Sequence, residues 1–271
     1  MPKPEKAYKN LDFLNSRAGR TVRILCEYEE PKARLEAAGV ENTIVMFGSA
    51  RIRSREESEE ILAAAEAALE NGTGDRGAVE TAAKRLKLSK YYEDTVELAR
   101  RLTEWSMERG GAQYHICSGG GPGIMEAANR GASKVEGAKS VGLGISLPFE
   151  AGVNEFTPDE LAFEFHYFFM RKLWFLYLAK AVIICPGGFG TLDEFFETLT
   201  LLQTGKIDRP LPLVLFGASF WNRVLNLDAM VEEGTISPGD PDLFLMTDSV
   251  DEAFEYVVSA LESVEAGNGD S

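Results

Sequence analysis

The sequence predicts an α/β protein: a single Rossmann-like domain in which helices cover both faces of a doubly wound parallel sheet. Short apolar runs rich in β-branched residues recur along the chain, as is typical of buried parallel strands. Segments of helical periodicity separate these runs, and such connections favour right-handed crossovers between parallel strands. Because ligands of such sheets bind at the carboxyl ends of the strands, the search for functional residues starts there.

The elements are expected in alternating order along the chain. Residues 43–47, Thr-Ile-Val-Met-Phe, should form the first strand, which leads into Gly48 and Ser49. Further strands are expected at residues 112–117, 140–147, 181–185, 213–216 and 243–246. Helices are expected at residues 56–69, 91–109, 124–134, 167–180, 192–203, 220–233 and 251–261, with a glycine-containing break at 71–75.

The two ends of the chain differ from this pattern. Residues 1–40 are polar and weakly periodic, so they are predicted to be an appended segment with one short helix over 32–38. Residues 41–263 are predicted to form the Rossmann-like domain. The small, acidic stretch 264–271 is predicted to be a disordered tail.

The charge of the chain limits its partners. Asp and Glu number 43 against 28 Lys and Arg, which gives a formal net charge of -15. Such a charge repels polyanions, so nucleic acid is excluded as an expected partner. A small phosphate compound is still compatible, because backbone N–H groups and one or two basic side chains can bind it locally.

The cysteines and the hydropathy pattern indicate a cytoplasmic protein. Cys26, Cys117 and Cys185 are odd in number and far apart, which indicates neither a disulfide framework nor a zinc cluster. Cys117 and Cys185 end apolar runs and are expected to be buried. With two histidines in the chain, no metal site is expected, and no apolar stretch has the length of a membrane span.

The strongest functional pattern is the loop Pro186-Gly187-Gly188-Phe189-Gly190-Thr191, between a predicted strand and a predicted helix. Its three glycines let the backbone approach an anion closely, and a helix N-terminus supplies unpaired N–H donors. The alternative is a tight turn in which Thr191 is the N-cap and Glu194 completes a capping box. Both interpretations are compatible with the sequence alone.

A second glycine loop, Ser118-Gly119-Gly120-Gly121-Pro122-Gly123, has the same context after the strand predicted at 112–117. Together with Gly48 and Ser49, the two loops should face one crevice at the carboxyl edge of the sheet. Neither loop has the spacing of the ATP-binding or dinucleotide-binding fingerprints. ATP hydrolysis and standard NAD binding are therefore disfavoured.

Charged side chains near these loops are candidates for chemistry. Asp193 and Glu194 fall in the first turn after the glycine loop, where a carboxylate could lie beside a sugar or could simply complement the helix dipole. Arg171 and Lys172 interrupt an aromatic stretch and could meet a phosphate or a carboxylate, or could extend to solvent.

The nine residues from Pro186 to Glu194 resemble the P-G-G-x-G-T-x-x-E signature of the Lonely Guy (LOG) phosphoribohydrolases. The second glycine loop, Phe47-Gly48-Ser49 and the pair Arg171-Lys172 resemble the family's other motifs, in the same order, over residues 43–261. The resemblance implies a Rossmann-like nucleotide-binding catalytic domain that forms a homodimer or higher oligomer. It also implies cofactor-free cleavage of AMP or cytokinin riboside monophosphates to free base and ribose 5-phosphate.

The resemblance also implies roles for individual residues. Arg171 and Glu194 would be the catalytic pair, and no metal would take part. The 5′-phosphate of a nucleoside monophosphate would be held by Gly187, Gly188, Gly190 and Thr191. Further substrate-binding positions would be Gly48, Ser49, Ser118, Gly119, Gly120, Met125 and Lys172.

Several alternatives stay open. Many LOG-type proteins were labelled lysine decarboxylases, but no motif here supplies the Schiff-base lysine of a pyridoxal-phosphate enzyme. The sequence also resembles non-catalytic proteins of the same broad superfamily, which carry or sense nucleotides or the molybdenum cofactor. Such proteins need the glycine loops but not Glu194 together with Arg171. Phe168-Phe169-Met170 stand where short plant-type members have Met-His-x, so the preferred base is open. The aromatic stretch around Trp174, Phe175 and Tyr177 is expected to offer a dimer surface.

Overall fold

The computed structural model describes residues 3–109, 113–146 and 152–269, and side chains up to residue 266. Within this part of the chain one sheet contains seven parallel strands in the order β4-β3-β2-β1-β5-β6-β7. The order reverses between β1 and β5, which confirms the doubly wound, Rossmann-like topology. The strands are β1 (Thr43–Phe47), β2 (His115–Ser118), β3 (Val141–Ile145), β4 (Ala162–Phe165), β5 (Ala179–Ile184), β6 (Leu213–Phe216) and β7 (Leu245–Thr247).

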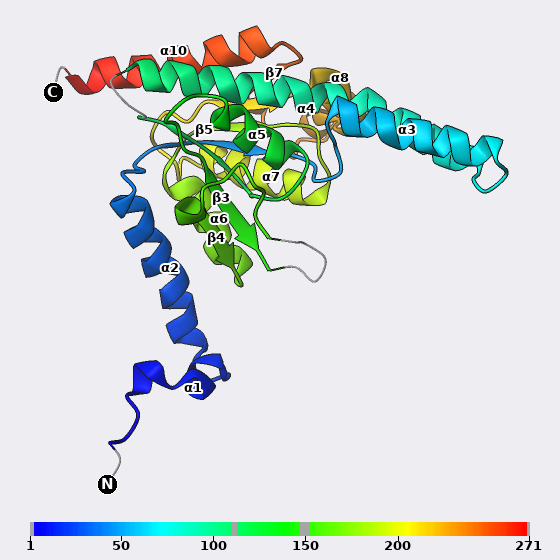
Figure 1. Cartoon of the computed structure of the whole chain (residues 1–271). Coiled ribbons are helices and arrows are strands. Elements are labelled where there is room, and N and C mark those ends of the chain that lie inside the picture. The colour runs from blue at the N-terminus through cyan, green and yellow to red at the C-terminus, as the bar shows by residue number, and fades with distance from the viewer. Residues whose placement is uncertain (1–2, 110–112, 147–151, 270–271) are drawn as a thin grey trace.

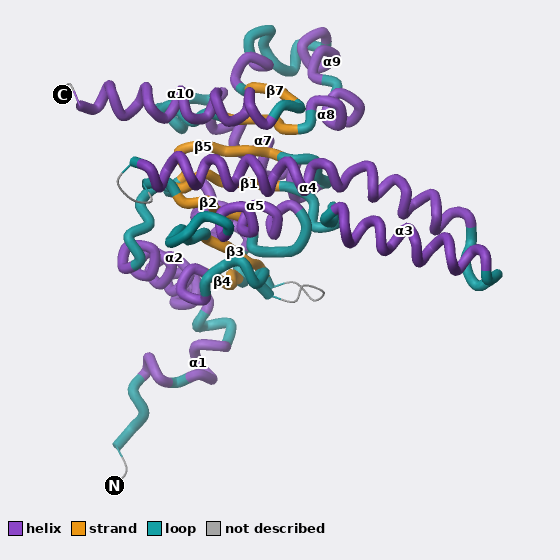
Figure 2. The backbone as a smooth tube through the Cα atoms, turned by 45° about the horizontal axis from the view of Figure 1, so that its top comes forward, coloured by secondary structure: helices purple, strands orange, loops and turns teal. Residues whose placement is uncertain are grey.

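Helices cover both faces of this sheet (Figures 1 and 2). They are α1 (Leu11–Asn15), α2 (Arg20–Ala37), α3 (Arg55–Glu70), α4 (Arg76–Glu108), α5 (Ile124–Ser133), α6 (Phe168–Tyr177), α7 (Phe189–Gln203), α8 (Ala218–Val224), α9 (Leu227–Glu232) and α10 (Val250–Gly269). Short 3₁₀ turns lie at Ala7–Lys9, Asp159–Leu161 and Asp240–Leu243. None of the helices in the described part of the chain is long and apolar enough to cross a membrane.

Two apolar cores, one on each face, follow from the alternation of side chains along the strands. Val45 and Phe47 of β1 point into the core that contains Trp174 and Phe175 of α6 and Phe195 of α7. The alternate residues of β1 point into the other core, together with buried residues of α4, α5 and α10, among them Ile44, Met46, Leu98, Ile124 and Val257. Figure 1 shows α4 and α10 side by side on that second face.

The structure contains one strand that the sequence analysis missed. β4 is an edge strand in which Phe163 and Phe165 are buried and Glu164 is exposed. It pairs with β3 from Gly142↔Ala162 to Ile145↔Phe165. The predicted strand at 112–117 is observed as β2 from His115, and residue 112 lies outside the described residues, as does residue 147 of the strand predicted at 140–147.

The N-terminal segment contains much more helix than predicted. The short helix expected over 32–38 is instead α2, which starts at Arg20 and packs along the β4 edge and α6. The Glu27 carboxylate accepts the backbone N–H groups of His166 (2.8 Å) and Tyr167 (3.1 Å). The Arg34 guanidinium stacks 3.9 Å from the centre of the Phe163 ring. The segment therefore covers an edge of the sheet that would otherwise be open.

The C-terminal prediction also needs correction, because α10 continues to Gly269 and residues 264–269 are helical rather than disordered. The helix is held by its contacts with α4 and the start of β2. The Tyr114 hydroxyl donates to Glu265 at 2.7 Å, and Arg109 pairs with Glu262 and Glu265. These contacts compensate for the small, acidic composition of this stretch.

A helical arm projects from the body of the molecule (Figure 1). It consists of α3 and the first half of α4, joined at the predicted break. α4 begins at Arg76, well before the predicted start at residue 91, and the Asp75 side chain caps it by accepting the Ala78 N–H at 2.8 Å.

Candidate functional site

Three glycine-containing loops meet at the carboxyl edge of the sheet, around the point where the strand order reverses. They follow β1, β2 and β5, and Ser49 links them through its backbone. The Ser49 N–H donates to the Pro186 carbonyl at 3.0 Å, and the Ser49 carbonyl accepts the Ile124 N–H at 3.1 Å. The convergence predicted from the sequence therefore holds for the loops themselves.

The loop after β5 carries an uncapped helix N-terminus. α7 begins at Phe189, its N-cap is Gly188, and no side chain caps it. The capping box of Thr191 and Glu194 is therefore wrong, because both residues already lie within the helix. Gly188, Phe189 and Gly190 are exposed, so the first-turn N–H groups are accessible to an anion.

Gly187 allows this loop to fold back on its own helix. A Cβ atom at Gly187 would lie 2.0 Å from Thr191 Oγ1, which no side chain can tolerate. Thr191 itself is 7% exposed. The predicted phosphate residues Gly187, Gly188, Gly190 and Thr191 thus form one turn of chain, in which the two later glycines have open space around them.

The loop after β2 is buried and internally bonded. The Ser118 hydroxyl donates to Asn129 Oδ1 at 2.6 Å and accepts the Gly120 N–H at 3.0 Å. Asn154 donates from its side chain to Asn129 Oδ1 and the Gly120 carbonyl, at 2.9 Å each. Gly119 and Gly120 are buried as well. Ser118 and Gly120 therefore take part in a buried hydrogen-bond network that fixes the conformation of this loop. Asn129 and Asn154, which complete the network, were not predicted from the sequence.

Arg171 of α6 reaches the second glycine loop. Its Nε donates to the Leu143 carbonyl at 2.6 Å, and Nη2 donates to the Gly119 carbonyl at 3.4 Å. A Cβ atom at Gly119 would lie 2.5 Å from Arg171 Nη2 and 2.6 Å from Met125 Sδ. An alanine at this position would force the Arg171 guanidinium and the Met125 thioether to move from their present positions.

Glu194 lies one turn inside α7 and is 7% exposed. The pKa of its carboxyl is raised to about 7: burial raises it most, Lys172 and Arg171 lower it, and Glu197 and Asp193 raise it. A carboxyl that titrates near neutrality at the end of a parallel sheet is typical of a functional group.

The ammonium group of Lys172 faces carboxylates rather than the glycine loops. Its Nζ lies 2.5 Å from Glu197, 3.0 Å from Asp193 and 3.6 Å from Glu194. Burial lowers the pKa of Lys172, but the hydrogen bonds to Glu197 and Asp193 outweigh it, and the pKa is raised. Sequence reasoning missed Glu197, although its position one helical turn after Glu194 was a usable signal.

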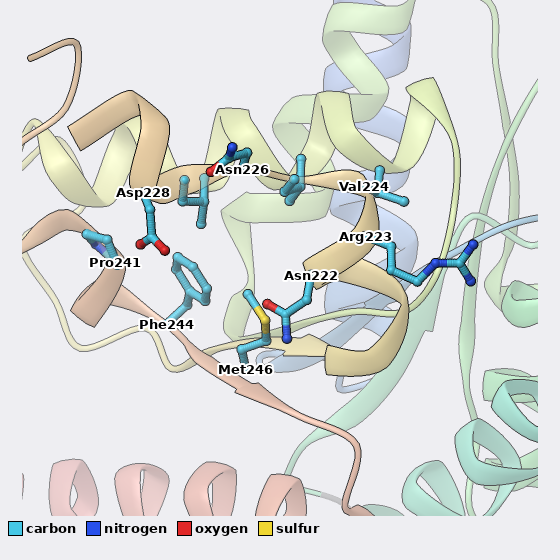
Figure 3. A pocket seen from close by; sticks show the side chains of 10 residues that line it. Asn222, Arg223, Val224, Asn226, Asp228, Pro241, Phe244 and Met246 are labelled. Atoms are coloured by element: carbon cyan, nitrogen blue, oxygen red, sulfur yellow. The ribbon is translucent and has the colours of Figure 1, made fainter. Parts of the chain in front are cut away.

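One surface hollow lies away from the predicted site residues and another lies beside them. A hollow of about 710 Å³ lies between α8, α9 and β7, and none of the predicted site residues lines it (Figure 3). Its polar side chains, including Asn222, Asn226 and Asp228, are exposed. A groove of about 610 Å³ lies beside α7, lined by Lys172, Leu192, Asp193, Phe196, Glu197, Thr200 and Leu201. Lys172, Asp193 and Glu197 of the titratable cluster line this groove, whereas Glu194 and the glycine loops are not among its lining residues.

No group of three or more His, Cys, Asp or Glu side chains in the described ranges is arranged to hold a metal ion. Cys117 and Cys185 are buried as predicted, and burial raises the pKa of both thiols to about 12. Neither thiol is a nucleophile at neutral pH.

The fold and the loops together define an α/β protein with an uncapped helix N-terminus beside a buried carboxyl group. A family model described as "Possible lysine decarboxylase" matches residues 125–257. The chain is 26% identical over 217 residues to a probable cytokinin riboside 5′-monophosphate phosphoribohydrolase, LOG4, of Oryza sativa subsp. japonica, covering 74% of this chain and 89% of that protein. The chain is thus similar to proteins of the LOG family, as the motifs indicated.

Other similarities are shorter or weaker. LOG1 of Arabidopsis thaliana, a cytokinin riboside 5′-monophosphate phosphoribohydrolase, is 44% identical over 61 residues, which span 22% of this chain and 28% of LOG1. The X-ray structure of a structural-genomics target is 17% identical with a TM-score of 0.48, covering 80% of this chain and 99% of that chain. The molybdenum cofactor binding protein of Rippkaea orientalis is 20% identical with a TM-score of 0.38, covering 64% and 88%.

Proposed function

We propose that this protein hydrolyses the N-glycosidic bond of a nucleoside 5′-monophosphate, AMP or a cytokinin riboside monophosphate, and releases the free base and ribose 5-phosphate. The observation that carries the proposal is the buried Glu194 carboxyl, one turn inside an uncapped helix N-terminus on a glycine loop. The family relationship supports the same reaction class.

The phosphate of the substrate would bind at the first turn of α7. The N–H groups of Gly188, Phe189 and Gly190 precede the intrahelical ladder, whose first bond runs from the Leu192 N–H to the Gly188 carbonyl at 2.9 Å. These donors and the positive end of the helix dipole favour an anion without any lysine. The dependence on backbone groups also explains how a chain of net charge -15 would bind a phosphate.

Glu194 would act on the sugar. When the C1′–N bond breaks, its electron pair leaves with the base and positive charge develops on the ribose ring. A carboxylate beside C1′ stabilises this charge and orients the attacking water. The water oxygen then bonds to C1′, and a proton derived from the water ends on the base. Arg171 of α6, fixed by the Leu143 and Gly119 carbonyls, would position the substrate from the side of the second glycine loop.

A homodimer is the proposed assembly, although of the three residues first expected at its interface only Tyr177 is exposed. Trp174 and Phe175 are 3% and 0% exposed and belong to the protein's own core, so the expectation that they offer an interface is wrong. The exposed large apolar residues of α6 are instead Phe168, Phe169, Leu173 and Tyr177. An apolar helix face of this kind is a reasonable subunit contact.

The experiment that tests the reaction uses the purified protein with AMP, GMP, CMP, UMP and isopentenyl-adenosine monophosphate. Chromatography of free base and ribose 5-phosphate identifies the cleaved bond and the preferred base. Release of inorganic phosphate instead of base would contradict the proposal, since it would show cleavage at the phosphate ester. Binding without any product would favour the carrier interpretation.

A further inference from the structure

One ammonium group in the site is shared by three carboxylates of a single helix. Lys172 of α6 forms its shortest contact, a hydrogen bond of 2.5 Å, with Glu197. Asp193 follows at 3.0 Å and Glu194 at 3.6 Å. The three acids lie on one face of α7, because residues three and four apart are neighbours on a helix surface. The Lys172 side chain is 18% exposed, so solvent screens these contacts only in part.

The distances divide the cluster into two parts. Glu197 and Asp193 are close enough to take hydrogen bonds from Lys172, whereas Glu194 meets it as a charge only. An ammonium has three donors, and two of them are committed to acids that lie outside the glycine loops. Lys172 therefore has little capacity left for a substrate phosphate.

The charges that face Glu194 come from two helices. Arg171 and Lys172 on α6 favour its ionised form, and Asp193 and Glu197 on α7 oppose it. Lys172 is the one ion-pair partner of Glu194 within the described ranges. Because Glu197 holds the ammonium at shorter range than Glu194 does, Glu197 determines how strongly Lys172 acts on the buried carboxyl.

We propose that Lys172 and Glu197 are positioning residues that together set the charge and orientation of the Glu194 carboxylate, and that Lys172 does not bind the substrate phosphate. This inference rests on the proposed function of Glu194, and it replaces the substrate-binding role expected for Lys172. Glu197 acts through Lys172 and touches no substrate.

The two residues should have opposite effects when they are replaced. In Lys172→Met the buried Glu194 loses its nearest cation, so its pKa rises by about one pH unit or more. In Glu197→Gln a repelling charge disappears and the ammonium is released toward Glu194, so the pKa of Glu194 falls. A purely structural role for the cluster would not move one carboxyl in two directions.

The direct test is a ¹³C NMR titration of the full-length protein labelled at the glutamate carboxyl carbons. The Glu194 resonance is assigned by its loss in Glu194→Gln. The control is Lys139→Met, which breaks an exposed ion pair with Glu160 and should leave the Glu194 titration unchanged. Where Lys172→Met or Glu197→Gln does not fold, as judged by circular dichroism, Lys172→Arg and Glu197→Asp are titrated and should give smaller shifts.

Opposite shifts in the two variants support the inference, whereas equal shifts or no shifts overturn it. AMP binding by calorimetry gives a second readout. The dissociation constant of Lys172→Met should stay within about threefold of the parent, whereas loss of a charge-assisted phosphate contact would weaken binding about tenfold or more. Neither measurement requires turnover, so failure of this inference is distinguishable from failure of the proposed reaction.

Discussion

Replacing Glu194 by glutamine should make the protein more stable above neutral pH. The carboxyl is 7% exposed, and burial raises its pKa from 4.5 to about 7. The difference corresponds to about 3 kcal/mol, at 1.36 kcal/mol for each pH unit. The unfolded chain ionises first as pH rises, so between about pH 4.5 and 7 the native state progressively loses this stability relative to the unfolded state. The glutamine variant cannot ionise and escapes the penalty.

The assay is urea denaturation of both proteins at pH 5 and pH 8, followed by tryptophan fluorescence. The unfolding free energies should differ by less than about 1 kcal/mol at pH 5 and by about 3 kcal/mol in favour of Glu194→Gln at pH 8. The matched control is Glu160→Gln, because that carboxyl is fully exposed and its pKa is lowered by Lys139. A variant that is no more stable than the parent at pH 8 would refute the inference that the buried, ionised Glu194 carboxylate destabilises the native state.

Four further outcomes are expected. If the ionised Glu194 carboxylate acts in catalysis, kcat/KM should rise with pH through about 7, and a rate that is flat from pH 5 to 9 would contradict this. Gly119→Ala should lower kcat about 100-fold, because the added Cβ would displace the Arg171 guanidinium. Normal turnover in that variant would show that the position of the guanidinium does not matter for the reaction. Asn129→Ala should lower the unfolding free energy, measured by denaturant titration, by about 1–3 kcal/mol. The reason is that Ser118, Ser140 and Asn154 would lose their hydrogen bonds to the Asn129 side chain. Phe169→Glu should convert a dimer to a monomer in light scattering, and an unchanged mass would move the interface elsewhere.

Most of the sheet could be predicted because its strands are short, apolar and interior. The runs at β1, β5 and β6 are buried on both faces, so their composition alone marks them. β4 was missed because its alternating pattern, with Glu164 outward, merges with the aromatic residues that begin α6. β4 is a strand because it pairs with β3 and packs against α2. Both contacts are made with residues distant in the sequence, so the local pattern could not reveal them.

Most of α2 was missed because its sequence is highly charged and contains a proline. α2 contains Pro31 and many charged residues, and its few apolar contacts are made with distant parts of the chain. α2 is also held by the hydrogen bond that Trp174 Nε1 donates to the Glu27 carbonyl at 3.0 Å. A low apolar content is therefore sufficient for a helix when tertiary contacts stabilise it.

In the site, the sequence indicated which loops converge but not how each is bonded. The convergence of the three glycine loops follows from their positions after strands, whereas the pairing of Arg171 with Glu194 was expected from the resemblance alone. The contact of Lys172 with Glu194 was not predicted. Asn154 could not be foreseen, because it comes from a loop whose path is determined by packing against Gly120. The role of Lys172 depends on side-chain distances that no spacing rule supplies.

The most direct test of the central claim is a paired measurement of product release and nucleotide binding for the parent protein and Glu194→Gln. The account predicts that the parent releases base and ribose 5-phosphate in equal amounts from at least one nucleoside monophosphate. Glu194→Gln should still bind that nucleotide, as calorimetry would show, without releasing base. Full turnover by the variant, or tight binding by the parent without any release of base, would contradict the claim.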